Sequence, residues 1–244
     1  MCSNNLKCNT AEALRLTACW IFFLTSVLGG VDYLMFVQDW PPTVCLHSSK
    51  FVTCEVPSKK NNWVIHGLWP SSYNLRIPRF CNSRNHFNLT EIQGLVSELE
   101  NEWPNLYVRR KASSFWKYEW EKHGTCAAVM PYFNSQKKYF SMVLKLKIHY
   151  DLFKAFKEGG ITPSREQPYM LGNITNILKT WLKAKVVVKC QTAKHFEYPV
   201  LHSIRMCMNM TFKLIDCPAS VGHCKANSVL YLPIETINSV KLQA

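Results

Sequence analysis

The sequence lacks the patterns that mark zinc proteins, repeat arrays and multidomain chains. The cysteines beyond residue 30 form no CxxC pair or zinc-finger spacing, and the E-x-x-x-H segment at 119–123 lacks the histidine pair of a metalloprotease helix. No internal repeat, low-complexity tract or Pro/Ser-rich linker divides the 244 residues. We therefore expect no metal site and a single domain with a substantial core.

Acidic residues are scarce. The chain has 16 Asp and Glu against 29 Lys and Arg, which gives a formal net charge of +13. Removing residues 1–30 takes away Lys7, Arg15 and Glu12, and so lowers this charge by one. A chain this basic attracts polyanions such as nucleic acid, sulfated glycans or anionic membranes, and charge alone does not choose among them.

Long apolar runs are absent except near the start, where the apolar stretch 16–28 follows a polar one and ends at Gly29-Gly30. This order is typical of a signal peptide over residues 1–30, which leaves 31–244 as a single mature domain. The alternative is an uncleaved anchor, but Asp32 interrupts the run, which is short for a bilayer span. We expect no stable membrane insertion after cleavage.

Eight cysteines lie beyond residue 30, and an even number without metal-site spacing indicates four disulfides formed in an oxidising compartment. Three N-x-S/T sequons, at Asn88, Asn173 and Asn209, are candidate glycosylation sites. Together with the leader, these features predict a secreted protein or one in the lumen of lysosomes or the endomembrane system.

Apolar periodicity indicates helices in the middle of the mature chain and strands at both ends. Helical spacing occurs within 92–103, 115–123, 136–157 and 173–183, and β-prone runs occur at 33–40, 63–65, 186–188, 198–208 and 229–232. This order predicts an α+β fold, with helices packed around an antiparallel sheet. Gly and Pro within 66–70 predict a turn there, Thr90 and Gln93 form a capping box, and Gly124 is placed to end the helix before it.

Two segments carry the chemistry: WVIHGLWP at 63–70 and SFWKYEWEKHGTC at 114–126. In a helix, Glu119 and His123 share a face, and Lys122 lies at their side. A carboxylate, a lysine and a histidine that converge near a helix end are an arrangement suited to a phosphate group.

RNA cleavage by transphosphorylation needs such groups. A base takes the proton of the ribose 2′-OH, which attacks phosphorus, an acid protonates the leaving 5′-oxygen, and a cation stabilises the transition state. Histidine suits both proton transfers because its unperturbed pKa is about 6.5. His66 and His123 are therefore the candidate general base and general acid. Taken singly, each could instead be a hydrogen-bonded structural residue, and Glu119 with His123 only an ion pair.

The two segments resemble the active-site blocks of the RNase T2 family, the secreted acid endoribonucleases, in sequence, order and separation. The opening FVQDWPPTVC resembles that family's first strand, so the resemblance runs from about Tyr33 to Cys224. It implies cleavage of single-stranded RNA through a 2′,3′-cyclic phosphate, with low base specificity and neither metal nor other cofactor. We expect a monomer.

By motif position, His66 and His123 fall on the two catalytic histidines of the family. Some descriptions of the family make His123 the base, so the two roles stay open. Glu119 and Lys122 fall on residues that stabilise the pentavalent phosphorus. The implied substrate contacts are Trp69, Phe115, Tyr118 and, in the first strand, Gln38. The implied disulfides, which spacing alone cannot select, are Cys45–Cys54, Cys81–Cys126, Cys190–Cys224 and Cys207–Cys217.

Two positions depart from the family pattern. The residue before the motif glutamate is usually histidine, and here it is Tyr118, which can donate a hydrogen bond but cannot become cationic. This change predicts weaker substrate binding or slower turnover, by about one to two orders of magnitude. Ser71 stands where many members have an acidic residue, which leaves base preference open.

Three functions fit the sequence. The first is a secreted or lysosomal endoribonuclease. The second is a secreted RNA-binding or immunomodulatory effector whose catalysis is impaired by Tyr118. The third is a polyanion- or membrane-binding effector that acts through charge alone. The intact set His66, Glu119, Lys122 and His123 favours the enzyme, because loss of catalysis usually leaves damage at such positions.

Overall fold

The computed structural model describes residues 30–46, 53–56, 62–74, 77–108, 110–194 and 196–234. The signal peptide expected at 1–30 lies outside the described residues except for Gly30, so it stays a prediction. In these ranges, none of the helices has both the length and the apolar character of a membrane span.

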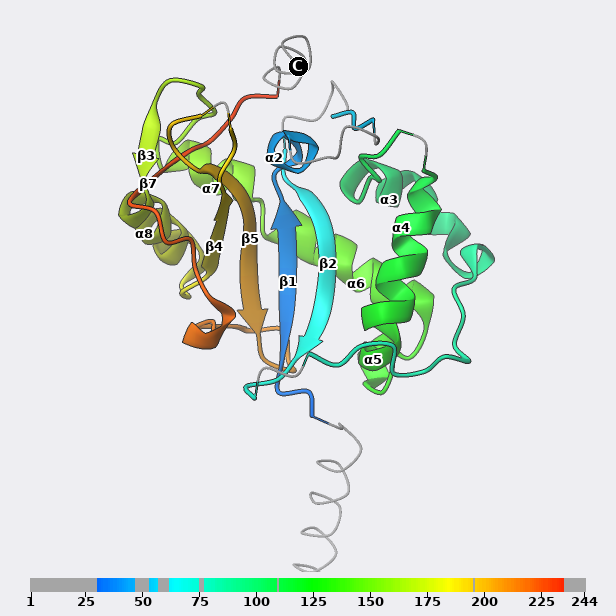
Figure 1. Ribbon diagram of the computed structural model, residues 1–244. Coiled ribbons are helices and arrows are strands. Elements are labelled where there is room, and N and C mark those ends of the chain that lie inside the picture. Colours follow the sequence, from blue (N-terminus) through cyan, green and yellow to red (C-terminus); the bar gives the residue numbers. More distant parts are fainter. Residues whose placement is uncertain are drawn as a thin grey trace, which may run out of the picture.

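One sheet forms the centre of the molecule, with strand order β2-β1-β5-β7-β3 and with β4 and β6 also paired to β5 (Figure 1). In the described part of the chain, every strand pair is antiparallel except β5 with β7. The α+β fold is therefore confirmed, while the sheet is mixed rather than wholly antiparallel. The strands are β1 (Tyr33–Asp39), β2 (Val64–Ser71), β3 (Pro168–Met170), β4 (Val187–Gln191), β5 (Val200–Met208), β6 (Leu214–Ile215) and β7 (Ser228–Leu230).

Most helices lie between β2 and β3, as the periodicity predicted, with a short helix also between β1 and β2 and a longer one between β3 and β4. The α-helices are α2 (Pro41–Leu46), α3 (Val96–Glu102), α4 (Ala112–Glu119), α5 (Thr125–Ala127), α6 (Gln136–His149), α7 (Leu152–Glu158) and α8 (Leu171–Leu182). Short 3₁₀ and π segments are η1 (Leu89–Leu95), η2 (Trp120–Gly124), η3 (Pro131–Phe133) and η4 (Ala219–Val221).

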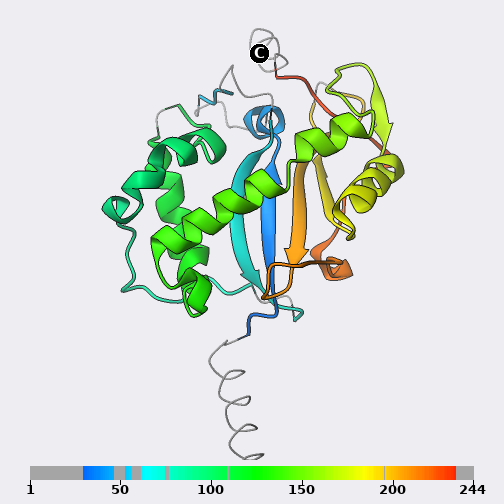
Figure 2. The ribbon, with the colours of Figure 1, turned by 180° about the vertical axis from the view of Figure 1, so that it is seen from behind.

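In the part of the chain that the structure describes, helices cover one face of the sheet and leave much of the other open. Figure 2 shows α6 and α7 crossing in front of β1, β2 and β5, and in Figure 1 the opposite face of these strands is turned to the viewer. Side chains of β1 alternate between the two faces. Leu34 and Phe36 join the main core with Phe140 of α6, while Met35 and Val37 join a smaller cluster on the open face.

The turn expected at 66–70 is wrong, because β2 runs through to Ser71. Pro70 is tolerated because β2 is an edge strand, paired only with β1, where a missing N–H costs no ladder bond. Gly67 is needed for close packing rather than for a turn. A Cβ at Gly67 would overlap the Glu119 carboxylate and come within 2.6 Å of Trp69 Nε1.

The expected end of the catalytic helix at Gly124 is also wrong. The chain continues from α4 through the π-helical η2 into α5, and Gly124 has an ordinary helical φ of −60°. Its Cβ would collide with the indole of the buried Trp120, so packing explains the glycine. The cap also differs from the expected Thr90–Gln93 box, because the side chain of Asn88 accepts the hydrogen bond from Thr90 N.

Within the described residues, four disulfides join the chain, and they are the pairs that the family resemblance implied: Cys45–Cys54, Cys81–Cys126, Cys190–Cys224 and Cys207–Cys217. Among the sequons, Asn88 and Asn173 are exposed, while Asn209 Oδ1 accepts hydrogen bonds from Thr211 and Lys213. Their glycosylation stays a prediction.

Candidate active site

The site lies on the open face of the sheet, where β1 and β2 meet α4 and η2. The register of these strands shifts by one residue: Val37 is opposite Gly67, but Gln38 is opposite Ile65. His66 is therefore the extra residue of a β-bulge, a feature that redirects side chains next to active sites. A break in the alternation of β2 thus sets the direction of the first predicted catalytic histidine.

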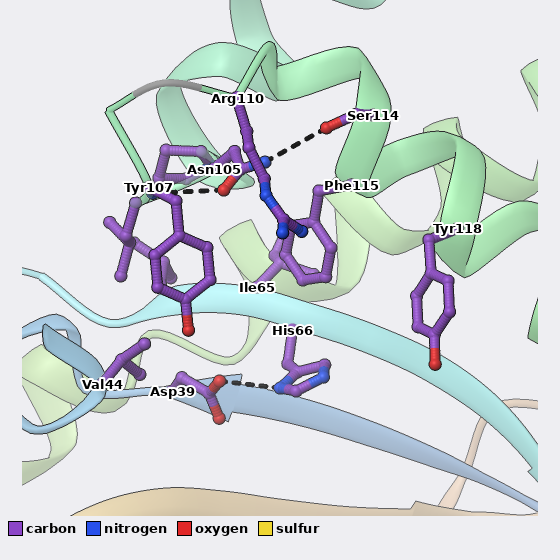
Figure 3. Close-up of a pocket in the computed structure, with 13 residues that line it drawn as sticks. Asp39, Val44, Ile65, His66, Asn105, Tyr107, Arg110, Ser114, Phe115 and Tyr118 are labelled. Atoms are coloured by element: carbon purple, nitrogen blue, oxygen red, sulfur yellow. Dashed lines mark hydrogen bonds and ion pairs between the residues drawn. The ribbon is translucent and has the colours of Figure 1, made fainter. Parts of the chain in front are cut away.

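Asp39, which the sequence analysis missed, is the direct partner of His66 (Figure 3). Its Oδ2 lies 2.7 Å from His66 Nδ1, and its own side chain is largely buried. Burial works against a charged imidazole, but the charge and hydrogen bond of Asp39 raise the pKa of His66 to about 9. His66 therefore carries a proton at neutral pH. No local signal marks Asp39, because its role depends on the register of β1 with β2.

Trp69 connects the second motif to the first. Its Nε1 donates to Glu119 Oε2 at 2.9 Å, and its ring stacks on His123 with 5.2 Å between ring centres and 27° between planes. Glu119 is 1% exposed, and burial raises the pKa of its carboxyl. Its other oxygen lies 4.0 Å from His66 Nε2. The two motifs therefore meet through one indole and one buried carboxyl.

His123 lies in the opposite electrostatic environment to His66. It is 3% exposed, and among the described residues its Nδ1 has no hydrogen-bond partner. Burial, together with the charges of Lys122 and His66, lowers the pKa of His123 to about 3. His123 is therefore neutral over the working range, with an imidazole nitrogen free to accept a proton.

Lys122 and Tyr118 form a pair at the rim. Lys122 Nζ donates to the Tyr118 hydroxyl at 2.8 Å and lies 4.7 Å from the ring centre. Tyr118 is 48% exposed, so the residue in place of the usual histidine faces the approach to the site. The Lys122 ammonium group is therefore held one helical turn from Tyr118, on the same helical segment as His123.

A pocket of about 410 Å³ opens beside His66. The predicted substrate contacts Phe115 and Tyr118 line it, and Phe115 meets His66 edge-on at 5.7 Å between ring centres (Figure 3). Unpredicted lining residues include Asn105, Tyr107 and Arg110, none of which belongs to a recognisable motif. Two aromatic walls and polar groups make this cavity suitable for a nucleobase.

Gln38 does not join the other predicted substrate contacts. It is 0% exposed, and its Nε2 donates to the backbone oxygen of Tyr150 at 2.9 Å. Because side chains alternate along β1, Gln38 faces the helices and its neighbour Asp39 faces the site. The expectation that Gln38 contacts substrate is therefore replaced by the contact of Asp39 with His66.

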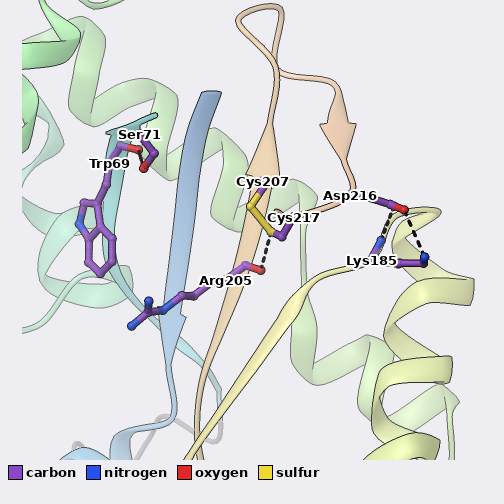
Figure 4. The surroundings of a disulfide bond; sticks show 7 residues. All are labelled: Trp69, Ser71, Lys185, Arg205, Cys207, Asp216 and Cys217. Atoms are coloured by element: carbon purple, nitrogen blue, oxygen red, sulfur yellow. Dashed lines mark hydrogen bonds and ion pairs between the residues drawn. A yellow bond between two sulfur atoms is a disulfide. The ribbon is translucent and has the colours of Figure 1, made fainter. Parts of the chain in front are cut away.

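Arg205 of β5 also reaches the site, and sequence reasoning did not single it out. Its guanidinium carbon lies 5.6 Å from the centre of the Trp69 ring (Figure 4). Arg205 is opposite Val37 of β1, which in turn is opposite Gly67.

Comparisons with known proteins agree with this geometry. The sequence profile of the Ribonuclease T2 family matches residues 31–217. Ribonuclease Oy of Magallana gigas is 38% identical over 188 residues, which cover 76% of this chain and 87% of that protein. The crystal structure of human RNase T2 has a TM-score of 0.72 at 34% identity and covers 83% of this chain and 98% of its own.

RNase NT, solved in complex with 5′-AMP, also has a TM-score of 0.72, at 26% identity, over 83% of this chain and 98% of its own. The fold, the two histidine segments and the profile match lead to one assignment. The chain belongs to the ribonuclease T2 family and is an endoribonuclease of the RNase T2 type.

Proposed function

We propose that this endoribonuclease cleaves single-stranded RNA through a 2′,3′-cyclic phosphate, with His123 as general base and His66 as general acid. The observation that carries the proposal is the opposite electrostatic setting of the two imidazoles. This assignment reverses the order first given from the sequence, in which His66 was the base.

His123 is suited to start the reaction. Its pKa of about 3 leaves it neutral, so it can take the proton of the ribose 2′-OH as that oxygen forms a bond to phosphorus. The stack on Trp69 fixes the plane of the imidazole. A base of such low pKa is weak, so positioning has to supply part of the rate.

His66 is suited to complete it. With Nδ1 held by Asp39, its Nε2 is the nitrogen that can donate to the 5′-oxygen as the bond from phosphorus to that oxygen breaks. The products are a 2′,3′-cyclic phosphate and a free 5′-hydroxyl, and the proton lost by the 2′-OH is balanced by the one given to the 5′-oxygen.

Lys122 supplies the positive charge for the phosphorane-like transition state, and Tyr118 adds a neutral hydroxyl where a cation would be stronger. The carboxylate of Glu119 is already engaged, because it accepts a hydrogen bond from Trp69 Nε1 and lies 4.0 Å from His66 Nε2. Its contacts with Trp69 and His66 make it a positioning residue for both motifs.

The pocket beside His66, walled by Phe115 and Tyr118, fits one base next to the cleaved bond. Trp69 remains our candidate for the residue that stacks on the neighbouring nucleobase. Four disulfides agree with a secreted or lysosomal location. RNase NT binds 5′-AMP, and we infer a nucleotide site at the corresponding face of this chain.

The test is RNA cleavage by the purified, oxidised mature chain from pH 4 to 8 in EDTA, beside His66→Ala and His123→Ala. We expect 2′,3′-cyclic ends from the wild type and loss of cleavage in both variants. A folded wild type that binds RNA without cleaving it at any pH would instead favour the RNA-binding effector.

A further inference from the structure

The open face of the sheet carries two cations that the proposed reaction does not use, Arg205 on β5 and Lys189 on β4. Arg205 is opposite Val37, while Lys189 is opposite Ser203, which is itself opposite Asp39. Directly opposite residues of paired strands lie on the same face. Both cations therefore belong to the face that carries the acid–base pair.

Arg205 makes no ion pair within the described part of the chain, and the only carboxylate whose charge acts on it there is that of Asp39, which already binds His66. None of the ion pairs found there includes it, and its Nε is buried without a hydrogen-bond partner. Its guanidinium carbon lies over the Trp69 ring, 5.6 Å from the ring centre, and a guanidinium in such a contact keeps N–H groups for an acceptor. A half-buried cation that makes no ion pair of its own is partly desolvated, so a bound anion would stabilise it.

Lys189 lies in a similar situation. Its Nζ donates to the backbone oxygen of Val221 at 3.2 Å, and the ion pairs of the described residues do not include it. Burial and the nearby charge of Arg205 lower the pKa of Lys189. Two like charges that disfavour each other in the free protein are a suitable setting for a phosphate between them.

We propose that Arg205 and Lys189 form a binding subsite for a phosphodiester group of the RNA chain outside the cleaved bond, beyond Trp69. The proposal rests on the proposed function, because it needs RNA to lie on this face. Adjacent strands are about 4.8 Å apart, so β5 and β4 extend the surface that β2 and β1 begin. The RNA backbone then crosses the strands, from the site at His66 toward Lys189.

The test compares substrates that differ in length. A dinucleoside monophosphate has only the cleaved phosphate, whereas a longer single-stranded oligonucleotide also reaches the subsite. In Arg205→Ala and in Lys189→Ala, we expect kcat/KM for the oligonucleotide to fall about tenfold further than kcat/KM for the dinucleotide, the loss of one charge-assisted hydrogen bond. Lys179→Ala is the matched control, since it removes one charge from an exposed position on α8.

Binding gives a readout independent of catalysis. A 2′-deoxy oligonucleotide cannot be cleaved, and the slope of its log affinity against log salt should fall by about one in Arg205→Ala and Lys189→Ala. Equal losses of kcat/KM on short and long substrates, with an unchanged salt slope, would overturn the subsite. Arg205 would then act only by holding Trp69 in place. If Arg205→Ala does not fold, Lys189→Ala decides the question alone. A wild type that binds but does not cleave contradicts the proposed function and leaves the subsite testable by this slope.

Discussion

The Nδ1 atom of His66 lies 2.7 Å from Oδ2 of Asp39, a contact between two neighbouring strands rather than within a motif. The carboxylate fixes which nitrogen of His66 faces the substrate and favours its charged form. If His66 is the acid, this contact sets the upper end of the pH range in which the enzyme works.

Asp39→Asn should lower that upper end. The acid is active only below its pKa, which is about 9 in the wild type and should move toward the ordinary value of about 6.5 without the charge of Asp39. At pH 8 this leaves about one thirtieth of the activity, with little loss at pH 5. Profiles of kcat/KM from pH 4 to 10 measure the shift.

The charges that face His66 from other elements, Glu119 on α4 and Arg205 on β5, remain in this variant. Asp216→Asn, which removes an exposed carboxylate paired with Lys185, serves as the control. An Asp39→Asn profile with an unchanged alkaline limb would show that Asp39 does not set the protonation of His66.

Gly67→Ala should lower both activity and stability. The added Cβ would meet Glu119 and Trp69, so the contact between the two motifs has to move. We expect kcat/KM to fall by at least tenfold and the free energy of unfolding to fall by about 1–3 kcal/mol. Steady-state kinetics and urea unfolding measure both. Gly94→Ala, where a Cβ meets nothing within 4 Å, is the control, and equal behaviour of the two variants would contradict the prediction.

Tyr118→His should raise activity. The imidazole can become cationic at the mouth of the site, and a charged hydrogen bond to phosphate is worth about one to two orders of magnitude in kcat/KM. The gain should be present at pH 5 and lost by pH 8, as the exposed histidine loses its proton. Tyr118→Phe separates the effect of removing the hydroxyl, and a flat response of Tyr118→His to pH would argue against a phosphate contact.

The Cys81–Cys126 disulfide should contribute more to stability than Cys45–Cys54, because it closes a longer loop. The sequence separations are 45 and 9 residues, for which chain entropy gives about 4 and about 2.6 kcal/mol. The paired serine variants should differ by about that margin in urea unfolding. Cys126 directly follows the second motif, so its loss should also reduce activity. A larger cost for the Cys45–Cys54 pair would contradict the entropic explanation.

Sequence reasoning reached the residues that local patterns specify. The two predicted motifs meet through Trp69, which stacks on His123 and donates a hydrogen bond to Glu119. It failed where a glycine had more than one use. At Gly67 and Gly124 the small residue permits close packing against a side chain from elsewhere in the structure or from the preceding turn, and a sequence does not distinguish that use from a turn or a helix end.

It also could not reach residues whose role depends on strand register. Asp39 meets His66 only because β1 and β2 pair with a bulge at that point, and Arg205 meets Trp69 from a strand more than a hundred residues away. A shift of one residue along β1 would place Gln38 at the site and turn Asp39 toward the helices. These contacts depend on how the strands pair and in which register, which a local sequence pattern does not specify.

The uncovered face of the sheet has a consequence for how a polymer is handled. In the described part of the chain, α6 and α7 cross the opposite face, and His66 stays partly accessible to solvent. A long RNA can therefore be laid sideways across the strands, without either of its ends having to be threaded through a tunnel. Cleavage can therefore begin at an internal phosphodiester bond, and the two product fragments can dissociate independently of each other.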